Sequence, residues 1–371
     1  MRKSGFALLV LLLALSHAIA QPQAETSPKN IILFIGDGMG VAQVTAGKTA
    51  KGTLNLEQFP VGGLMTTHSS DSYVTDSAAG ATALATGVKT YNGAIGVDPN
   101  KKPLKTVLEY AEDAGKSTGL VATCTITHAT PASFAAHVEG RSLEPLIAED
   151  LAKSNVDVMF GGGWSFFVPN SQPESKRTDN KDLLAQLSRR MKVIRTPQEF
   201  AALSGNDVTS VAGLFAAGHL SKAKAREVSL LDMTRKAIQI LSKNSTGFFL
   251  MVEGSQIDWA GHDNDSDGII NEMVDLDEAV GAGLSYAKEN GQTLVVVTAD
   301  HETGGYALNG GSLAEYKITM PAFTTKNHTG VMVPVFAYGP GSVAFGGIHD
   351  NTLIGSKLIE YVQNSGGANS R

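Results

Sequence analysis

The chain has 371 residues, a length that suits one large α/β domain or two ordinary ones. Charged residues make up 18% of it and hydrophobic residues 42%, a globular composition that excludes a disordered chain. The formal net charge of −6 and the lack of any basic cluster exclude a nucleic acid as a specific partner, and the single cysteine excludes an intrachain disulfide.

The first twenty residues, MRKSGFALLVLLLALSHAIA, have the pattern of a secretory signal peptide. A basic start at Arg2 and Lys3 precedes an apolar segment too short to span a membrane, and a small-residue cleavage site ends at Ala20. Cleavage there removes two positive charges and no negative ones, so the formal charge moves from −6 to −8. We therefore expect a secreted, periplasmic protein with no membrane segment after cleavage.

Strand and helix patterns then alternate along the chain. Runs of apolar residues predict strands buried on both faces at 31–35, 119–127, 156–162, 247–254, 293–302 and 331–341. Apolar residues at helical spacing, closed by a glycine, predict helices at 104–114 and 269–290. This order predicts an α/β fold with a doubly wound, mainly parallel central sheet and helices on both faces.

Two segments interrupt this alternation. Polar loops and short helices at about 162–230 predict a small cap on the main domain, and about 302–330 is expected to be a second, short insertion. Because no linker composition separates these segments from the rest, residues 21–371 are expected to form a single domain.

The stretch VTDSAAGATALATG, residues 74–87, places an acid and a hydroxyl before a run of small residues. In one interpretation Asp76 and Ser77 cap a helix, since both residue types are preferred there and alanine is the best helix former. In the other, Ser77 is a nucleophile at a helix N-terminus, where small side chains leave room for an anion. The stretch alone leaves both open.

Three predicted strands run into acids, namely Asp37, Glu253 and Asp300, the last followed by His301. An acid after a strand often only starts a turn, but the carboxyl ends of parallel strands meet at one edge of a sheet, so three acids favour a shared site. Close unpaired carboxylates repel, so a metal ion is expected among them. Asp300 and His301 can serve one ion only if the strand ends before them, because neighbours in a strand point to opposite faces.

The segment EGSQIDWAGHD adds a second candidate metal site. Asp258 and His262 are four residues apart, which on a helix places both side chains on one face, within reach of one ion. An ordinary surface pair is the alternative. Imidazole with carboxylate suits zinc, whereas an all-oxygen set suits magnesium. Two zinc ions together would suit an in-line displacement at phosphorus.

With VTDSAAGATA, GDGMG, VEGSQIDWAGH, TADHETGG and HTG present, the chain resembles the alkaline phosphatase family from about Pro28 to Val362. The resemblance implies that Ser77, in the Asp76-Ser77 pair, is the phosphorylated nucleophile. It also implies that Arg141 grips two phosphate oxygens, a task that suits a planar guanidinium.

The resemblance further implies two zinc ions and one magnesium ion. One zinc would be held by Asp258, His262 and His328. The other would be held by Asp37, Asp300 and His301, with Ser77 joining it. Magnesium would share Asp37 and use Glu253 and Thr130.

Two positions differ from the best-known bacterial pattern, which has Asp where this chain has His128 and Lys where it has Trp259. Both are implied to lie near the third metal ion and the phosphate, so the identity of that ion is left open. Cys124, in an apolar run, is expected to be a buried small hydrophobe. The remaining histidines of the mature chain are expected to be structural: His68, His137, His219 and His349.

The function implied is hydrolysis of small-molecule phosphate monoesters at alkaline pH, through a phosphoserine intermediate. A phosphodiesterase or sulfatase of the same superfamily is the first alternative. A non-catalytic periplasmic protein that binds metal or phosphate is the second. A homodimer is left open.

Overall fold

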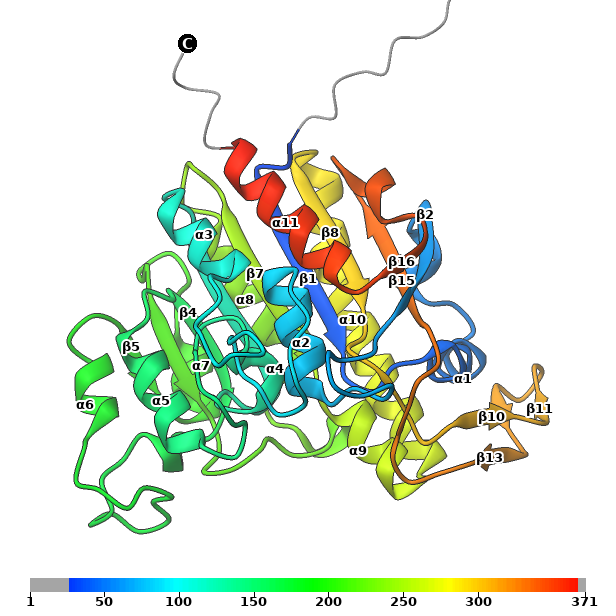
Figure 1. The fold of residues 1–371 in the computed structure, drawn as a ribbon, viewed down its shortest axis with the longest axis horizontal. Coiled ribbons are helices and arrows are strands. Elements are labelled where there is room, and N and C mark those ends of the chain that lie inside the picture. The colour runs from blue at the N-terminus through cyan, green and yellow to red at the C-terminus, as the bar shows by residue number, and fades with distance from the viewer. Residues whose placement is uncertain (1–26, 366–371) are drawn as a thin grey trace, which may run out of the picture.

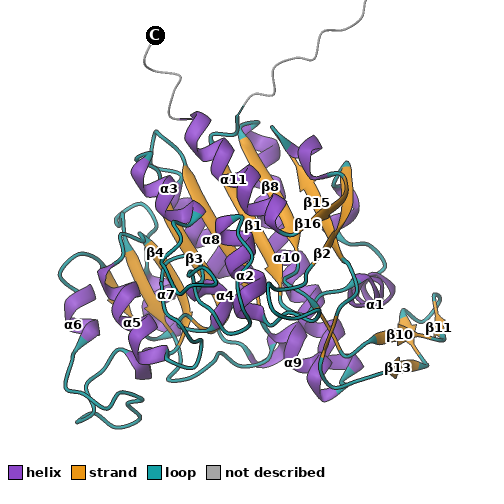
Figure 2. Cartoon of the chain, in the orientation of Figure 1, coloured by secondary structure: helices purple, strands orange, loops and turns teal. Residues whose placement is uncertain are grey.

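The computed structural model describes residues 27–365. Ten strands form one sheet, in the order β16-β2-β15-β8-β1-β7-β3-β4-β6-β5 (Figures 1 and 2). Their bounds are β1 Asn30–Gly36, β2 Val61–Thr66, β3 Ser117–Thr125, β4 Val158–Gly162, β5 Lys192–Ile194, β6 Val211–Leu214, β7 Phe248–Gly254, β8 Thr293–Thr298, β15 Val333–Tyr338 and β16 Gly347–Asp350.

Helices cover both faces of this sheet. Figure 1 shows α2, α3 and α11 in front of it and α8 and α10 behind it. The helices are α1 Val41–Lys51, α2 Ser77–Thr86, α3 Val107–Asp113, α4 Ala129–Ala132, α5 Glu144–Lys153, α6 Leu183–Leu187, α7 Pro197–Ala202, α8 Leu230–Leu241, α9 Gln256–Asp263, α10 Ser266–Asn290 and α11 Thr352–Ser365. None of the helices within residues 27–365 has the length and hydrophobicity of a membrane-spanning segment.

The predicted α/β class and the mainly parallel sheet are confirmed. The central strand β1 lies between β7 and β8 and runs parallel to both, and every residue of these three strands is buried. The strand predicted at 331–341 is β15, but it runs antiparallel to both β8 and β2. The predicted signal peptide lies outside the described residues.

Segment 162–230 differs from the expected loops and short helices, because two of its stretches join the main sheet. β6 pairs with β4, and β5 pairs with β6, all in parallel, so the segment lengthens one end of the sheet. The sequence did not predict these strands because β6 has only four residues and β5 only three. In so short a segment, apolar residues do not distinguish a strand from a turn of helix.

Segment 302–330 forms small antiparallel pairs outside the main sheet. β9 Glu302–Thr303 pairs with β14 His328–Thr329, which brings the two ends of the segment together. Between them lie β10 Tyr306–Leu308 with β13 Pro321–Phe323, and β11 Gly311–Ser312 with β12 Lys317–Ile318. The pairing of β14 with β9 fixes the position of His328 relative to the end of β8.

The predicted helix at 104–114 is α3, which begins later than expected because Thr106 caps it. The Thr106 hydroxyl accepts a hydrogen bond from the Glu109 amide, and the Glu109 carboxylate accepts one from the Thr106 amide, forming a capping box. Near the other end of α3, burial raises the pKa of the Glu112 carboxyl from 4.5 to about 7.

This raised pKa predicts a pH-dependent stability. Between those two pH values the folded protein holds a proton that the unfolded chain has lost, so the free energy of unfolding falls as pH rises through this window. Glu112→Gln should remove that dependence and stabilise the protein at about pH 8.5 by about 1 kcal/mol, allowing for solvent screening. Thermal unfolding at about pH 6 and pH 8.5 measures it. Glu227→Gln, on an exposed residue, is the control; parallel pH profiles for wild type and Glu112→Gln would contradict the prediction.

Candidate active site

Ser77 is the first residue of α2, a helix that lies in front of the sheet (Figure 1). Asp76 is the N-cap, and its Oδ1 accepts a hydrogen bond from the Ala79 amide at 3.0 Å. Ser77 is only 2% exposed, and its Oγ lies 3.2 Å from Nε2 of His301. Both interpretations of this stretch therefore fit the structure, since Asp76 caps the helix and leaves the Ser77 hydroxyl facing the strand ends.

Small residues let α2 lie directly against the end of β8. A Cβ added to Gly80 would come within 3.1 Å of both the Cβ and the carbonyl oxygen of Asp300. In the GDGMG motif, Gly38 has a φ of +75°, and a Cβ there would lie 2.7 Å from the Cα of Asp258. A side chain at either position would push the chain away from an acid of the site.

Asp37, Asp300 and His301 form one group of candidate metal ligands, and all three are completely buried. His301 Nε2 lies 3.4 Å from Oδ1 of Asp37 and 3.2 Å from Oδ2 of Asp300. The sequence required the strand to end before Asp300, and it does, because β8 ends at Thr298. Both residues can then face the same point in space.

Asp258, His262 and His328 form a second such group. Asp258 and His262 lie on one face of α9, with Nε2 of His262 3.4 Å from Oδ2 of Asp258. His328 comes from β14, and its Nε2 lies 3.4 Å from Oδ1 of Asp258. The Nδ1 atoms of His262 and His328 lie 2.5 Å and 3.0 Å from the carbonyl oxygens of Lys326 and Thr75. Each ring can donate through Nδ1 and keep Nε2 free for an ion.

The carboxylates of the site are buried without enough hydrogen bonds. Among the described residues, both carboxylate oxygens of Asp37, one each of Asp300 and Glu253, and the Thr130 hydroxyl are buried with no hydrogen-bond partner. Burial raises the pKa of Asp37 well above its ordinary value, that of Asp300 to about 6 and that of Glu253 to about 7. Uncompensated buried acids are costly, and divalent cations are the partners that this set of oxygen and imidazole donors fits.

Arg141 lies beside the Ser77 end of α2. Its Nη1 donates to Oδ2 of Asp76 at 3.0 Å, while its Nη2 lies 3.4 Å from Nε2 of His128. The side chain remains 29% exposed, so part of the guanidinium faces solvent. Asp76 therefore holds both the start of α2 and the guanidinium, which places a fixed positive charge next to the Ser77 hydroxyl.

Comparison with known proteins identifies the family of this chain. Residues 28–323 match the family model described as alkaline phosphatase. Alkaline phosphatase 4 of Bacillus subtilis is 38% identical over 90% of this chain and 89% of its own length. Alkaline phosphatase of Escherichia coli is 34% identical over 90% of this chain and 86% of its own length. The chain belongs to the alkaline phosphatase family. It is a phosphomonoester hydrolase, and metal binding is part of its chemistry.

Solved structures agree with this assignment. The alkaline phosphatase of the Antarctic bacterium TAB5 superposes with a TM-score of 0.84 at 42% identity, over 91% of this chain and 99% of that one. A variant of that enzyme in which a histidine is replaced by aspartate has been solved with Mg bound in its M3 site. The common fold places the carboxyl ends of β1, β7 and β8 at the site of this phosphatase.

Three side chains near the site of this phosphatase were not predicted as part of it. Thr303 donates a hydrogen bond to Oδ1 of Asp258, and its Oγ1 lies 3.3 Å from Nδ1 of His301, so it contacts both groups of ligands. His219, expected to be structural, has its ring centroid 4.5 Å from that of Trp259 and 5.6 Å from that of His128. Cys124 lies beside Glu253. Of these three residues, only Thr303 could have been recognised from the sequence, because it directly follows the TADHE motif.

Glu302 is the buried anchor of segment 302–330 in this alkaline phosphatase. Its carboxylate accepts hydrogen bonds from Gln43, from the Gly305 and Tyr306 amides and from the Thr329 hydroxyl, directly after His328. Glu302→Ala removes the acceptor of the Gly305 and Tyr306 amides and of the Thr329 hydroxyl, and so frees the strand that carries His328. We expect metal affinity to fall by roughly 10- to 100-fold. Zinc titration of the metal-depleted enzyme measures it, with exposed Glu315→Ala as the control; equal affinities would contradict the prediction.

Proposed function

We propose that the enzyme hydrolyses phosphate monoesters through a phosphoserine formed on Ser77. The observation that supports this is the position of the Ser77 hydroxyl, which lies 3.2 Å from His301 and at the N-terminus of α2. Arg141 is next to it, and both groups of candidate ligands border it. A hydroxyl so placed, in a site built for cations, is suited to attack phosphorus.

In this proposal two zinc ions and one magnesium ion are bound. Asp258, His262 and His328 would hold one zinc, and Asp37, Asp300 and His301 the other, with Ser77 as a further ligand. Asp37, Glu253 and Thr130 would hold magnesium. Bound ions would supply positive charge and lower the pKa of hydroxyl groups attached to them. The unpartnered oxygens of Asp37, Glu253 and Thr130 support this distribution.

The protein's own groups would then position the reaction. Arg141 would bind two phosphate oxygens, with Asp76 holding its guanidinium in place, and the free amides at the start of α2 would face the same anion. Ser77 Oγ would form a bond to phosphorus on the side opposite the leaving alcohol. A water molecule would later attack the phosphoserine from the side that the alcohol left, releasing inorganic phosphate.

The proposed intermediate can be trapped directly. After incubation with radiolabelled inorganic phosphate and an acid quench, wild type should retain acid-stable phosphoserine and Ser77→Ala should retain none. Peptide mapping should find the label at Ser77. Label on any other residue, or equal labelling of the two proteins, would refute the assignment.

Arg141→Ala is expected to weaken the binding of phosphate. The guanidinium supplies charge-assisted hydrogen bonds, so the inhibition constant of inorganic phosphate should rise roughly 10- to 100-fold. Steady-state inhibition measures it. The inhibition constant of Arg141→Lys should lie between those of wild type and Arg141→Ala, because lysine keeps the charge but not the paired donors. The control Arg189→Ala, on an exposed residue, should have the inhibition constant of wild type. Unchanged product inhibition in Arg141→Ala would place the arginine outside the phosphate site.

We further propose a single domain over residues 21–371, with segments 162–230 and 302–330 as elaborations of it. The pairing of β5 and β6 with the main sheet supports one continuous unit. Secretion to the periplasm rests on residues 1–20. His128 and Trp259 would flank the third ion and the phosphate, since the His128 ring lies 6.1 Å from that of Trp259 and next to Arg141. A homodimer would be compatible with this proposal.

A further inference from the structure

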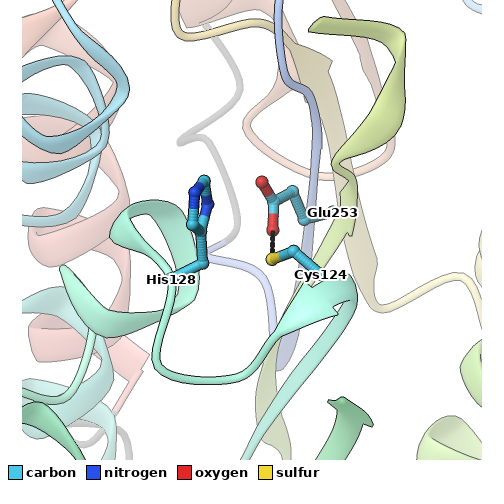
Figure 3. Close-up of side chains that lie close together, drawn as sticks. All are labelled: Cys124, His128 and Glu253. Atoms are coloured by element: carbon cyan, nitrogen blue, oxygen red, sulfur yellow. Dashed lines mark hydrogen bonds between the residues drawn. The ribbon is translucent and has the colours of Figure 1, made fainter. Parts of the chain in front are cut away.

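Cys124, His128 and Glu253 lie together at one side of the active site. Each offers an atom, and these atoms all lie within 4.8 Å of one another. Cys124 is near the end of β3, His128 lies just before α4, and Glu253 is near the end of β7. Figure 3 shows the Glu253 carboxylate joined to the Cys124 thiol by a hydrogen bond, with the His128 ring to one side of both. Three different elements therefore bring three metal-ligating residue types to one point.

Two polar atoms of this cluster are buried without a hydrogen-bond partner. Cys124 and Glu253 are completely buried, and the thiol Sγ lies 3.3 Å from Oε2 of Glu253. The other carboxylate oxygen, Oε1, is buried with no partner, and so is Nδ1 of His128. Buried polar atoms are rarely left without partners, so these two atoms indicate a missing ligand at this point.

We propose that Cys124, His128 and Glu253 bind a zinc ion, so that the third metal position of this chain prefers zinc to magnesium. The inference rests on the third ion of the proposed function and changes its identity. Thiolate and imidazole are ligands of zinc, whereas magnesium takes oxygen ligands and keeps much of its water. On binding, the S–H bond of Cys124 breaks, the proton leaves to solvent and the sulfur lone pair forms the bond to zinc.

The geometry is close to what such a site requires. Zinc bonds of about 2.0–2.3 Å in a tetrahedron place neighbouring ligand atoms roughly 3.3–3.8 Å apart. The Cys124–Glu253 separation of 3.3 Å already lies in that range. Nδ1 of His128 has no hydrogen-bond partner and Nε2 lies 3.4 Å from Nη2 of Arg141, so binding would require the side chain to rotate until a ring nitrogen reaches the ion. Asp37 interacts electrostatically with both Glu253 and Cys124, so its carboxylate would offset part of the positive charge of the ion.

Cobalt substitution tests the thiolate bond without any measurement of activity. Cys124 is the only cysteine in the sequence, so a cysteine thiolate-to-cobalt charge-transfer band in the near ultraviolet can arise only from it. The full enzyme, loaded with three equivalents of Co²⁺, should show this band. Cys124→Ser should retain three cobalt ions and lose the band. Thr234→Val, a change at another buried and unpartnered hydroxyl, should keep it.

Metal competition tests the preference. Dialysed against zinc with excess magnesium, wild type should retain three zinc ions per chain, and Cys124→Ser should retain two zinc ions and one magnesium. Three cobalt ions without the band in wild type would overturn the role of Cys124 and leave the proposed function standing. Only two bound ions in wild type would overturn both the inference and the third ion of the proposed function. The cobalt spectrum of wild type decides the matter even if the variants fail to fold.

Discussion

Ser77→Ala is expected to lower phosphomonoester turnover by at least about a thousandfold while the metal ions stay bound. The variant loses the Ser77 hydroxyl, which lies at the start of α2 and 3.2 Å from His301, and water would have to attack phosphorus in its place. The variant loses one proposed ligand, but Asp37, Asp300 and His301 remain and the other group is unchanged, so metal content should equal that of wild type. Turnover of an aryl phosphate and elemental analysis measure the two quantities.

The control for this variant is another buried serine. Ser165 is 1% exposed, and its hydroxyl donates to the carbonyl oxygen of Ala217, away from the site. Ser165→Ala should cost about 1 kcal/mol of stability and leave turnover within a few-fold of wild type. If Ser77→Ala retained near-normal turnover with full metal content, another group would have to be the nucleophile.

Removal of the metal ions should abolish activity and lower the melting temperature by roughly 10 °C or more. Asp37, Asp300 and Glu253 are completely buried and have carboxylate oxygens without hydrogen-bond partners. Without cations, these acids must either repel one another or take up protons, and both outcomes destabilise the folded state. Calorimetry with and without a chelator measures the change.

The chelator saturated with zinc beforehand is the control, and it should change neither property. Adding zinc and magnesium back to the depleted protein should restore both activity and melting temperature. An unchanged melting temperature after complete metal loss, confirmed by elemental analysis, would contradict the proposal that ions compensate the buried acids.

The parts of the site that sequence alone could predict are those set by local geometry. The spacing of Asp258 and His262 places them on one helix face, and acids after buried strands converge because parallel strands end at one edge. The positions of Arg141, Thr130 and His328 could come only from the resemblance. Each of these residues is brought to the site by tertiary packing, and no local sequence pattern encodes such packing. His328, for example, is positioned by the pairing of β14 with β9.

The strands of the main sheet that sequence analysis missed are short or rich in glycine. β2, with the sequence VGGLMT, and β6, with the sequence VAGL, lack the β-branched run that indicates a buried strand. Cys124 was predicted to be a buried small hydrophobe, and its burial is confirmed. Its contact with Glu253 was not predictable, because an apolar run does not show which of its members faces a neighbouring strand's acid.

The two groups of ligands differ in how they are built. Asp37, Asp300 and His301 are completely enclosed at the ends of β1 and β8, whereas the side chains of His262 and His328 are 37% and 15% exposed and one of them comes from segment 302–330. An ion bound at the enclosed group would be shielded from solvent by the sheet, whereas an ion bound at the more exposed group would exchange with the solution first. The supply of zinc outside the molecule would then regulate how many copies are active at any moment.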